Sequence, residues 1–405
     1  MAEQLPDELQ KNALVGKRVD ALIIGGGPVG LLLAIGLARQ GRHIALVERM
    51  PPKQSPSFDG RVLALSYGSK KILDALGVWS GLASCVTAIE HVHVSQKGYL
   101  GLTHLHADEM KVPALGYSIT AFDLGNVLWK IAAEMPEIEL YTESTLKTFE
   151  QTESTVSATV EQTGGKPQQF QTRLLIGADG TDSQVRKVLE LPLKVKQYDA
   201  FGVIAKITSA EHPNGWAYER FTEEGPVALL PMAGQDHKAV MVVPEHQVDA
   251  VKAMSDEAFI EAFTEKMGAR FGGFVAVSER VAYPLKETYV DQMVKGRVVL
   301  MGNASHTQHP VAAQGLNLGI SDISDFLALS MSVEDLGNAE MLAAYEQQRH
   351  PEHEKIMGFT DGLIQVFQNS SAVVGHLRGL GLMAVEALPR LRKRLTKLGM
   401  GLAGK

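Results

Sequence analysis

The sequence predicts an α/β protein built from a βαβ domain, an inserted domain with a mixed β-sheet, and a helical C-terminal region. Three observations predict this fold class. A glycine-rich turn joins a buried strand to a helix near the N-terminus, short β-like runs fill residues 199–284, and leucines recur at helical spacing over residues 377–402. The expected segments are 17–88, 120–190 and 285–345 for the first domain, 89–119 and 191–284 for the second, and 346–405 for the C-terminal region.

Length and composition fit an ordinary globular protein. The chain has 405 residues, of which 45% are hydrophobic, and this is enough for two or three domains with separate cores. Its net charge of −7 argues against nucleic-acid binding, which needs cations that contact phosphates. A single cysteine, Cys85, excludes an internal disulfide and a thiolate metal cluster, and it fits a reducing compartment. No spacing of His, Asp and Glu indicates a metal site.

The sequence contains no evident targeting or membrane-spanning segment. Residues 1–17 lack an apolar stretch, and the longest run of apolar residues and glycine is Val29–Ala38. That run is far shorter than the ~20 residues that a helix needs to cross a bilayer. We expect a cytoplasmic protein that is either soluble or peripheral to the inner membrane.

The first motif is a glycine-rich turn made of Gly25, Gly27 and Gly30. In a dinucleotide-binding βαβ unit, the first glycine allows a tight turn, the second lets a pyrophosphate approach the backbone, and the third lets helix and strand pack closely. A second strand, residues 43–47, ends in Glu48, whose carboxylate can accept hydrogen bonds from a ribose diol and repels a 2′-phosphate. The unit therefore predicts FAD or NAD and argues against NADP at this site.

A second stretch, residues 298–322, combines a buried strand, a polar loop and the start of a helix. Its first residues form an apolar run suited to a strand that is covered on both faces, and the loop contains Pro310 and Gly315. A helix begins near Leu316, where unpaired N–H groups and the helix dipole stabilise an electron-rich ligand atom. The stretch predicts a cradle for a large anionic cofactor.

A third turn lies within residues 176–186 and places Asp179 between two glycines. The glycines present backbone amides, Asp179 can hold a cofactor hydroxyl, and Asp182 or Ser183 can cap the helix that follows.

Together these motifs resemble those of the single-component flavin hydroxylases. The family's second flavin motif is usually written G-D-A-x-H, then P, then G-Q-G-x-N-x-G-x-x-D. In this sequence it stands as Gly302-Asn303-Ala304-Ser305-His306, then Pro310, then Ala313-Gln314-Gly315-Leu316-Asn317-Leu318-Gly319 and Asp322. Asn303 replaces the usual Asp and Ala313 replaces a Gly, although the amide oxygen of an Asn can still accept hydrogen bonds. With Phe58-Asp59-Gly60-Arg61 and residues 225–232, the Gly-Asn variant most resembles the ubiquinone-biosynthesis hydroxylases that act on 2-polyprenyl-6-methoxyphenol.

The resemblance implies a class A flavin-hydroxylase fold with bound FAD. The residues that it assigns to the cofactor are Gly25, Gly27, Gly30, Glu48, Arg61, Asp179, Asn303, Pro310, Gly315, Leu316 and Asn317. By this resemblance Arg61 lies near the pyrophosphate, and Asn303 accepts hydrogen bonds from the ribityl chain. The amides of Leu316 and Asn317 face the flavin N1–C2=O edge, and Pro310 shapes the wall beside the flavin.

The same resemblance implies that the enzyme uses O₂ to hydroxylate a polyprenylphenol, and that the reaction passes through a flavin C4a-hydroperoxide. NADH or NADPH would bind transiently as the hydride donor, because the sequence has no second glycine-rich unit. No pair of residues stands out as general acid and base. Arg220 is a weak candidate for holding a phenolic oxygen, and a salt bridge to an acid such as Glu223 explains it as well. Pro310 is the other weak candidate near the reaction.

The inserted domain is expected to contain one amphipathic helix, capped by Ser255 and ended by Gly268, and to be joined by the strands within residues 89–106. The C-terminal region is amphipathic and basic, with seven cations against one acid over residues 376–405, and Pro389 interrupts it. Such a region can lie on an anionic membrane, dock on another ubiquinone-biosynthesis protein, or pack on its own protein.

Three other functions remain open from the sequence. The chain could be a sister hydroxylase acting at another ring carbon, or a hydroxylase of a small aromatic acid, which would need cations in its pocket. It could also be a non-catalytic flavin-binding member of a biosynthetic assembly.

Overall fold

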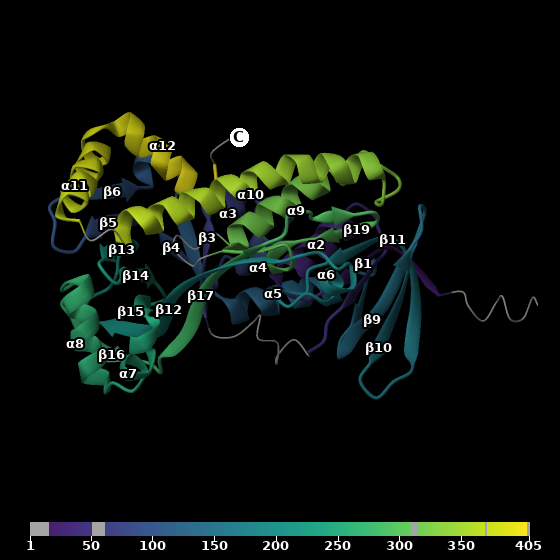
Figure 1. The fold of residues 1–405 in the computed structure, drawn as a ribbon, viewed down its shortest axis with the longest axis horizontal. Helices are drawn as coiled ribbons and strands as arrows, with labels where there is room; N and C mark the ends of the chain where they lie inside the picture. Colours follow the sequence, from purple (N-terminus) through teal and green to yellow (C-terminus); the bar gives the residue numbers. More distant parts are fainter. Residues whose placement is uncertain (1–15, 51–60, 309–314, 369–370, 403–405) are drawn as a thin grey trace, which may run out of the picture.

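The computed structural model describes residues 16–50, 61–308, 315–368 and 371–402, and Figure 1 shows their arrangement. Pro310, Ala313 and the Phe58–Gly60 segment lie outside these residues.

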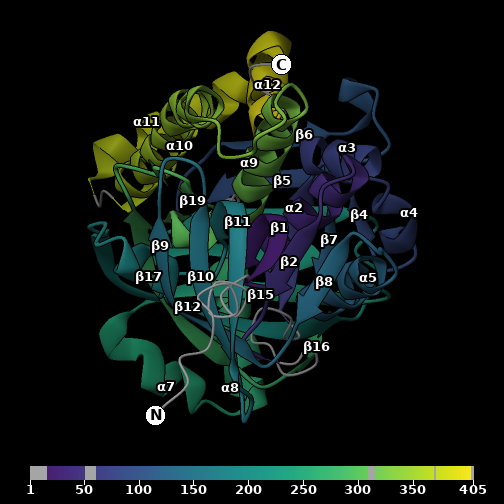
Figure 2. The same cartoon turned by 90° about the vertical axis from the view of Figure 1, so that its right-hand side faces the viewer.

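One of the three β-sheets has a parallel centre. Its strands are β1 (Lys17–Ile24), β2 (Ile44–Val47), β8 (Ile138–Tyr141), β9 (Ser144–Gln151), β10 (Val156–Gln162), β11 (Pro167–Gly177), β18 (Val294–Lys295) and β19 (Val298–Leu300). The main path runs β18-β19-β11-β1-β2-β8, and β9 and β10 continue it from β11 as antiparallel strands. Figure 2 shows β11, β1, β2 and β8 side by side.

The two faces of this sheet are covered by different layers. Ala21 and Ile23 of β1 share a core with helices α2 (Pro28–Arg39), α5 (Ala121–Ala133) and α9 (Gly315–Ser330). Leu22 and Ile24 point the other way, into a core with β9, β10 and the short helix α6 (Gln184–Val188). Strands covered on both faces read as continuous apolar runs, which is why the sequence predicts them well.

A second, nine-stranded sheet forms the left-hand body in Figure 1. It contains β5 (His91–Gln96), β6 (Leu102–His106), β12 (Lys194–Ser209), β13 (Trp216–Thr222), β14 (Gly225–Pro231), β15 (Asp236–Pro244), β16 (Phe274–Val277), β17 (Val281–Tyr289) and β20 (His306–Thr307). The order is β20-β17-β12-β15-β14-β13-β5-β6, with β16 beside β12. The expectation that the 89–106 strands join this sheet is confirmed, because β5 pairs in parallel with β13.

Two helices, α7 (Val248–Lys252) and α8 (Asp256–Met267), cover the outer face of this second sheet. The Ser255 hydroxyl accepts a hydrogen bond from the Ala258 amide, and Gly268 ends α8, as the sequence predicts. Phe259, Phe263 and Met267 are buried against the sheet.

A small antiparallel sheet connects the two larger ones and was not anticipated from the sequence. It consists of β3 (Val62–Ser66), β4 (Thr87–Ile89) and β7 (Gly116–Thr120), flanked by α3 (Tyr67–Ala75) and α4 (Trp79–Leu82). The Ser118 hydroxyl donates to the carbonyl of Pro231, and the Lys238 amine donates to the carbonyl of Val62 at 2.6 Å. These bonds attach the sheet to the ends of β14 and β15.

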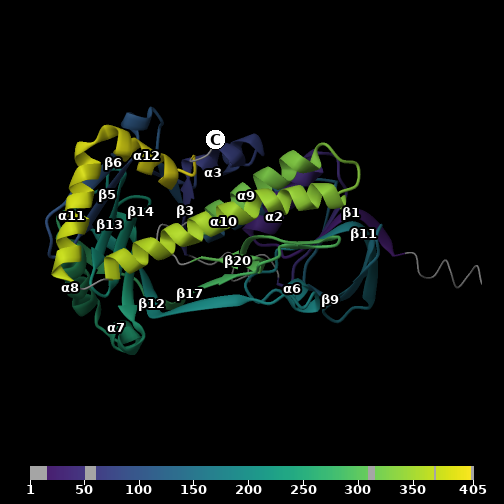
Figure 3. The ribbon, with the colours of Figure 1, turned by 45° about the horizontal axis from the view of Figure 1, so that its top comes forward.

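The C-terminal region is helical, as expected. It contains α10 (Ala339–Gln368), α11 (Ala372–Ala387) and α12 (Pro389–Gly399), and Figure 3 shows α10 running along the molecule beside α9. Pro389 separates α11 from α12. The boundaries expected at residues 285 and 345 fall inside β17 and α10, which are continuous elements.

The remaining short turns are η3 (Asp108–Met110), η4 (Glu245–Gln247) and η5 (Gly302–Ala304).

Candidate active site

The three glycine-bearing turns meet at one edge of the first sheet. Strands β1, β11 and β19 are neighbours and parallel, and their last residues, Ile24, Gly177 and Leu300, lie opposite one another. Parallel strands end at the same edge, and ligands of open α/β sheets bind outside that edge. The turns that follow these strands carry the first, third and second motifs in that spatial order.

Close backbone packing explains two of the glycines in the first motif. Gly25 has φ +112°, and a Cβ there would collide with the carbonyl of Ala178 in the third motif. A Cβ on Gly30 would collide with the carbonyl oxygen of Gly25, so α2 can begin against the turn only if residue 30 is glycine. The first and third motifs are therefore in direct contact.

The second motif packs against the same helix through Val29. A Cβ on Gly302, which has φ +56°, would lie 3.0 Å from the Cγ2 of Val29, and one on Gly319 would lie 2.9 Å from the same atom. The start of α2 thus fits between η5 and the first turn of α9.

Arg186, to which the sequence analysis gave no role, ties the third motif to the second. Its guanidinium is buried and donates to the carbonyls of Ala304 at 3.0 Å and Thr181 at 2.7 Å. The signal that could have identified it is an arginine between two valines in the short helix that follows the Asp-Gly turn. Its partners are the backbone carbonyls of Ala304, 118 residues away, and of Thr181 in the preceding turn. A hydrogen bond to a backbone carbonyl leaves no pattern in the sequence.

Glu48 follows β2 and reaches back to the first turn. One carboxylate oxygen accepts a hydrogen bond from the Gly26 amide at 2.6 Å, and the other accepts from the Met50 amide at 3.0 Å. A carboxylate oxygen has two lone-pair directions, so each can still accept a hydrogen bond from a ligand hydroxyl. The carboxylate is half-buried beside the turn, where the sequence predicts it.

Asp179 carries an unsatisfied oxygen at the same edge. Its Oδ2 accepts from the amides of Gln184 at 2.6 Å and Val185 at 3.3 Å, while Oδ1 is buried and has no hydrogen-bond partner among the described residues. Burial raises the pKa of this carboxyl above its usual value. Ser183 caps α6 by accepting from the Arg186 amide at 3.0 Å. A buried acceptor without a partner is costly, and a ligand hydroxyl would satisfy it.

The residues of the second motif have different environments. Asn303 is exposed on η5, and Gly315 begins α9 with open space where a Cβ would be. Leu316 is half-buried. The buried Asn317 side chain accepts from the Ser66 amide at 2.8 Å and donates to the carbonyl of Ala64 at 2.9 Å, which fixes the start of α9 to β3. The side chain of Asn317 is thus structural. The free backbone amides at the start of α9 are the groups that a ligand could contact.

Arg61 and Arg220 lie on different sides of the second sheet. Arg61 is half-buried directly before β3, near the bond between Lys238 and Val62. Arg220 donates to the carbonyl of Met267 at 2.8 Å, where α8 ends. That bond places the Arg220 guanidinium on the helix-covered face and not beside Glu223.

The uncovered face of the second sheet is turned toward the small sheet and carries a row of half-buried residues. Glu219, Ala228 and Val240 lie directly opposite one another on three neighbouring strands, so their side chains share a face. Leu230 and Lys238 are two positions further along and share that face, and Lys238 reaches Val62. The alternate residues are buried under α8. The uncovered face is therefore mainly apolar and retains accessible surface.

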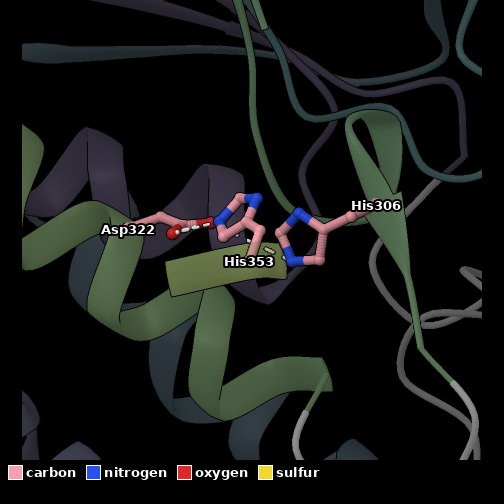
Figure 4. Close-up of side chains that lie close together, drawn as sticks. All are labelled: His306, Asp322 and His353. Carbon is pink, nitrogen blue, oxygen red and sulfur yellow. Dashed lines mark hydrogen bonds and ion pairs between the residues drawn. The ribbon is translucent and has the colours of Figure 1, made fainter. Parts of the chain in front are cut away.

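A buried charge cluster ties β20 to α9 and α10, as Figure 4 shows for His306, Asp322 and His353. The three side chains place ligand atoms within 4.8 Å of one another, although the sequence gave no sign of a metal site because they lie far apart in the chain. Asp322 Oδ1 accepts from His353 Nε2 at 2.8 Å and from Arg349 Nε at 2.7 Å. Since the guanidinium already compensates the carboxylate, we interpret the cluster as an ion-pair network.

Burial sets the protonation states of this cluster. It lowers the pKa of His306 to about 3, so the ring is neutral at physiological pH. The pKa of Asp322 lies well below its usual range, because the charges and hydrogen bonds of His353, His306 and Arg349 outweigh its burial.

Comparison with known proteins adds the family. Residues 18–360 match the model of the FAD binding domain family. The chain belongs to this family. A ubiquinone hydroxylase, UbiL of Rhodospirillum rubrum, is 29% identical over 391 residues, covering 95% of this chain and 90% of that protein. The 3-demethoxyubiquinol 3-hydroxylase of Escherichia coli is 26% identical over 396 residues, covering 96% of this chain and 100% of that protein. An uncharacterized protein of Synechocystis, slr1300, is 31% identical over 397 residues, with 97% and 95% covered.

Solved structures share the fold of this chain. The p-nitrophenol 4-monooxygenase PnpA of Pseudomonas putida superposes with a TM-score of 0.79 at 15% identity, covering 96% of this chain and 100% of that chain. PqsL of Pseudomonas aeruginosa gives a TM-score of 0.71 at 20% identity, with 91% and 100% covered.

The resemblance inferred from the motifs and the predicted fold class are confirmed. The chain is a FAD-dependent monooxygenase of the ubiquinone-biosynthesis hydroxylase family, which uses FAD with NAD(P)H. No helix among the described residues is both long and apolar enough to cross a membrane.

Proposed function

We propose that this enzyme hydroxylates the ring of a polyprenylated phenol, 2-polyprenyl-6-methoxyphenol, in ubiquinone biosynthesis. The proposal depends on one arrangement: three glycine-bearing turns meet at the ends of β1, β11 and β19, and the uncovered face of the second sheet lies beyond β3. That face is mainly apolar. The UbiL and 3-demethoxyubiquinol hydroxylase relatives support the substrate class.

The residues at the edge of the first sheet fit FAD. The unsatisfied Oδ1 of Asp179 calls for a hydroxyl donor, such as those of the ribityl chain. Gly25 and Gly30 let the turn and α2 pack closely, and Gly27 directly before α2 would let a pyrophosphate approach the helix start, whose amides favour an anion. Glu48 would accept from the ribose hydroxyls.

The other assigned residues complete the proposed FAD site. Arg61 would pair with the pyrophosphate, and Asn303 would accept from the ribityl chain. The amides at Gly315, Leu316 and Asn317 would face the electron-rich edge of the flavin ring, and Pro310 would form the adjoining wall.

Bound FAD supplies the oxygen chemistry once a nicotinamide has reduced it. The chain's own contribution is to bind and orient the phenol and to exclude water. The Ala228, Leu230 and Val240 side chains of the second sheet offer an apolar surface for the ring and the start of the tail. Two lysines also lie on this face: Lys238 donates to the carbonyl of Val62, and Lys206 pairs with Asp236.

The test is a reaction of the purified flavoprotein with a short-tailed 2-polyprenyl-6-methoxyphenol. We expect the phenol to accelerate anaerobic flavin reduction by NADH or NADPH, and we expect O₂ then to give a product heavier by one oxygen, whose position is read by NMR. Hydroxylation at another ring carbon would identify a sister enzyme. Equal turnover of a small aromatic acid, or flavin reduction that no phenol accelerates, would overturn the proposal.

We also propose that the enzyme reaches its substrate by binding peripherally to an anionic membrane through α11, α12 and the β5–β6 turn. Helix α11 packs on that turn through Gly375 and Gly379, which contact Tyr99 and Leu100. Helix α11 exposes four large apolar residues, Val373, Leu377, Leu380 and Met383, of which Leu377 is 60% and Leu380 57% accessible. Leu100 of the turn is 86% accessible.

Charge and packing support a membrane as the occupant of this surface. Helix α12 exposes Arg390, Lys393, Arg394 and Lys397 next to the apolar side chains. Arg392 instead holds the helix on its own protein through both carboxylate oxygens of Glu109, at 2.7 and 3.0 Å. Exposed leucines flanked by cations bind anionic interfaces through apolar burial and charge together.

Vesicle sedimentation tests this surface. We expect the protein to bind phosphatidylcholine vesicles that contain phosphatidylglycerol, and to bind vesicles of pure phosphatidylcholine more weakly. The Leu377→Gln/Leu380→Gln double variant should bind at least about tenfold more weakly, because it removes apolar side chains from the interface. Met331→Gln, at a site that is 76% accessible beyond the end of α9, is the control. Equal binding by the double variant, or none by the unaltered protein, would disprove this attachment.

A further inference from the structure

Glu219 is an acidic residue on the uncovered face of the second sheet. It lies at the middle of β13, opposite Ala228 of β14 and Val94 of β5. Its neighbours in sequence, Tyr218 and Arg220, point to the other face, where Tyr218 packs on Phe271 and Arg220 bonds Met267. Strand alternation therefore turns the carboxyl toward the small sheet and the proposed phenol site.

The Glu219 carboxyl is desolvated and has no partner among the described residues. It forms no hydrogen bond or ion pair with them, and burial alone raises its pKa to about 8. Of the charged groups on the same face, Lys238 donates to the carbonyl of Val62, and Lys206, directly opposite it, pairs with Asp236 at 2.9 Å. The histidines of β5, His91 and His93, pair with His106 and His104 and share the face of Tyr218.

A carboxyl in this position requires a reason, because an unpaired acid on a mainly apolar surface costs folding free energy. The residue nevertheless keeps part of its surface accessible, so the carboxyl borders a space that a ligand can enter. A phenolic hydroxyl is a hydrogen-bond donor and would satisfy a carboxylate there. An aromatic carboxylate would instead bring a negative charge beside this carboxyl, in a poorly solvated site.

We propose that Glu219 accepts a hydrogen bond from the ring hydroxyl of the substrate and makes the site selective for neutral phenols over aromatic carboxylates. This inference rests on the proposed function and adds a substrate-binding residue to it. It also separates this enzyme from hydroxylases of small aromatic acids, whose pockets need a cation where this chain places an acid.

Three variants test the inference: Glu219→Ala, Glu219→Gln, and the control Glu223→Gln, which alters an exposed acid just beyond β13. Ring binding is measured from the change in flavin absorbance on titration with a methoxyphenol and with a benzoate of similar size. KM and kcat are measured for the short-tailed polyprenylphenol from pH 6.5 to 9.5. FAD content and melting temperature show that each variant is folded and loaded.

The hydrogen bond predicts a specific pattern. Glu219→Ala should weaken phenol binding and raise KM about 10- to 100-fold, as expected for a hydrogen bond to a charged group, while it improves benzoate binding. In the unaltered enzyme kcat/KM should rise with pH as the carboxyl ionises near pH 8. Glu219→Gln should bind the phenol better than Glu219→Ala but more weakly than the ionised enzyme, because its amide oxygen can accept but carries no charge, and it should lose that pH dependence. Glu223→Gln should behave as the unaltered enzyme.

The outcomes separate the two proposals. If Glu219→Ala leaves phenol binding, benzoate binding and the pH profile unchanged, the role of Glu219 is wrong even when the phenol is hydroxylated. If the unaltered enzyme hydroxylates no polyprenylphenol, the proposed function falls, while the titrations still show whether Glu219 selects neutral rings.

Discussion

Burial raises the pKa of two carboxyl groups at the site, Asp179 and Glu219, and these groups differ in their partners. Asp179 is half satisfied by the start of α6, whereas Glu219 has no partner among the described residues. At the scale of single residues, the unsatisfied acceptor is the most informative feature, because a folded chain keeps such a group only at a cost.

Replacement of Asp179 should weaken the hold on FAD. Asp179→Asn can keep one oxygen on the Gln184 amide, and its NH₂ group then faces the cofactor where an acceptor is needed. We expect about a tenfold rise in the FAD dissociation constant, which corresponds to one neutral hydrogen bond of about 1.4 kcal/mol. Fluorescence titration of the apoprotein measures it. Asp182→Asn, at an exposed position of the same turn, should bind FAD normally, and equal affinities for both variants would argue against the role of Asp179.

Glu219→Gln should stabilise the protein at neutral and mildly alkaline pH. The folded carboxyl has a pKa of about 8, raised by burial from the ordinary 4.5 that it has in the unfolded chain. The unfolded state therefore ionises first, and the stability that Glu219 contributes is present below pH 4.5 and is lost as pH rises to about 8. Urea unfolding at pH 5 and pH 8 measures the effect. A wild-type stability that falls no more than that of the variant over this range would contradict the raised pKa.

The sequence reveals these residues unevenly. Asp179 and Glu48 stand at fixed distances from glycine turns, so their positions were predictable. Arg186 and the acceptor role proposed for Glu219 depend on which strands become neighbours, and the pairing of β13 with β14 and β5 is what turns Glu219 toward the site.

At the scale of elements, the ion-pair network fixes the cofactor loop to the C-terminal region. Asp322 on α9 binds Arg349 and His353 on α10, and the His306 ring on β20 packs at a tilt against that of His353, with ring centroids 4.1 Å apart. Asp325 of α9 accepts a second hydrogen bond from Arg349 at 2.7 Å. The network joins three elements that the sequence separates, and each is identifiable from the sequence only as a helix or strand.

Asp322→Asn should destabilise the protein strongly. It leaves the buried Arg349 with the charge of Asp325 alone, and breaking a buried pair costs about 3 kcal/mol or more. Urea denaturation of the FAD-loaded protein measures this loss. Glu354→Gln, at an exposed site on α10, should cost less than about 1 kcal/mol and serves as the control. A loss in Asp322→Asn no greater than in this control would show that the network contributes little.

The elements predicted best are those with local signals. The Ser255 cap and Gly268 end define α8, and the apolar runs define β1, β2 and β19. The small sheet of β3, β4 and β7 went unpredicted because its strands are only three to five residues long and pair across long loops.

At the scale of the whole molecule, three buried histidines make the fold sensitive to acid. Burial lowers the pKa of His306 to about 3 and that of His93 and His237 to about 4, from an ordinary value of 6.5. The unfolded chain takes up these protons first, so stability falls as pH drops from about 6.5 toward 4.

Unfolding midpoints in urea at pH 6.5, 5.5 and 4.5 test this acid sensitivity. The His237→Gln variant, which keeps a partner for the Ser209 hydroxyl, should lose less stability over this range than the unaltered protein. The exposed His212 provides the matched control, and His212→Gln should follow the unaltered protein. A stability that does not change between pH 6.5 and 4.5 would contradict the lowered pKa values.

The second sheet begins with β20, two residues of the cofactor motif that pair with Thr288 and Tyr289 of β17. Backbone hydrogen bonds therefore connect every strand from β20, which contains His306 of the proposed FAD site, to β5 and β6 under α11. Strand β13, which carries Glu219, lies between them. A tilt of that far edge on a lipid surface would be transmitted strand by strand to the loop around the isoalloxazine. Membrane docking and the readiness of the flavin for its donor would then be mechanically linked, with no separate hinge needed between them.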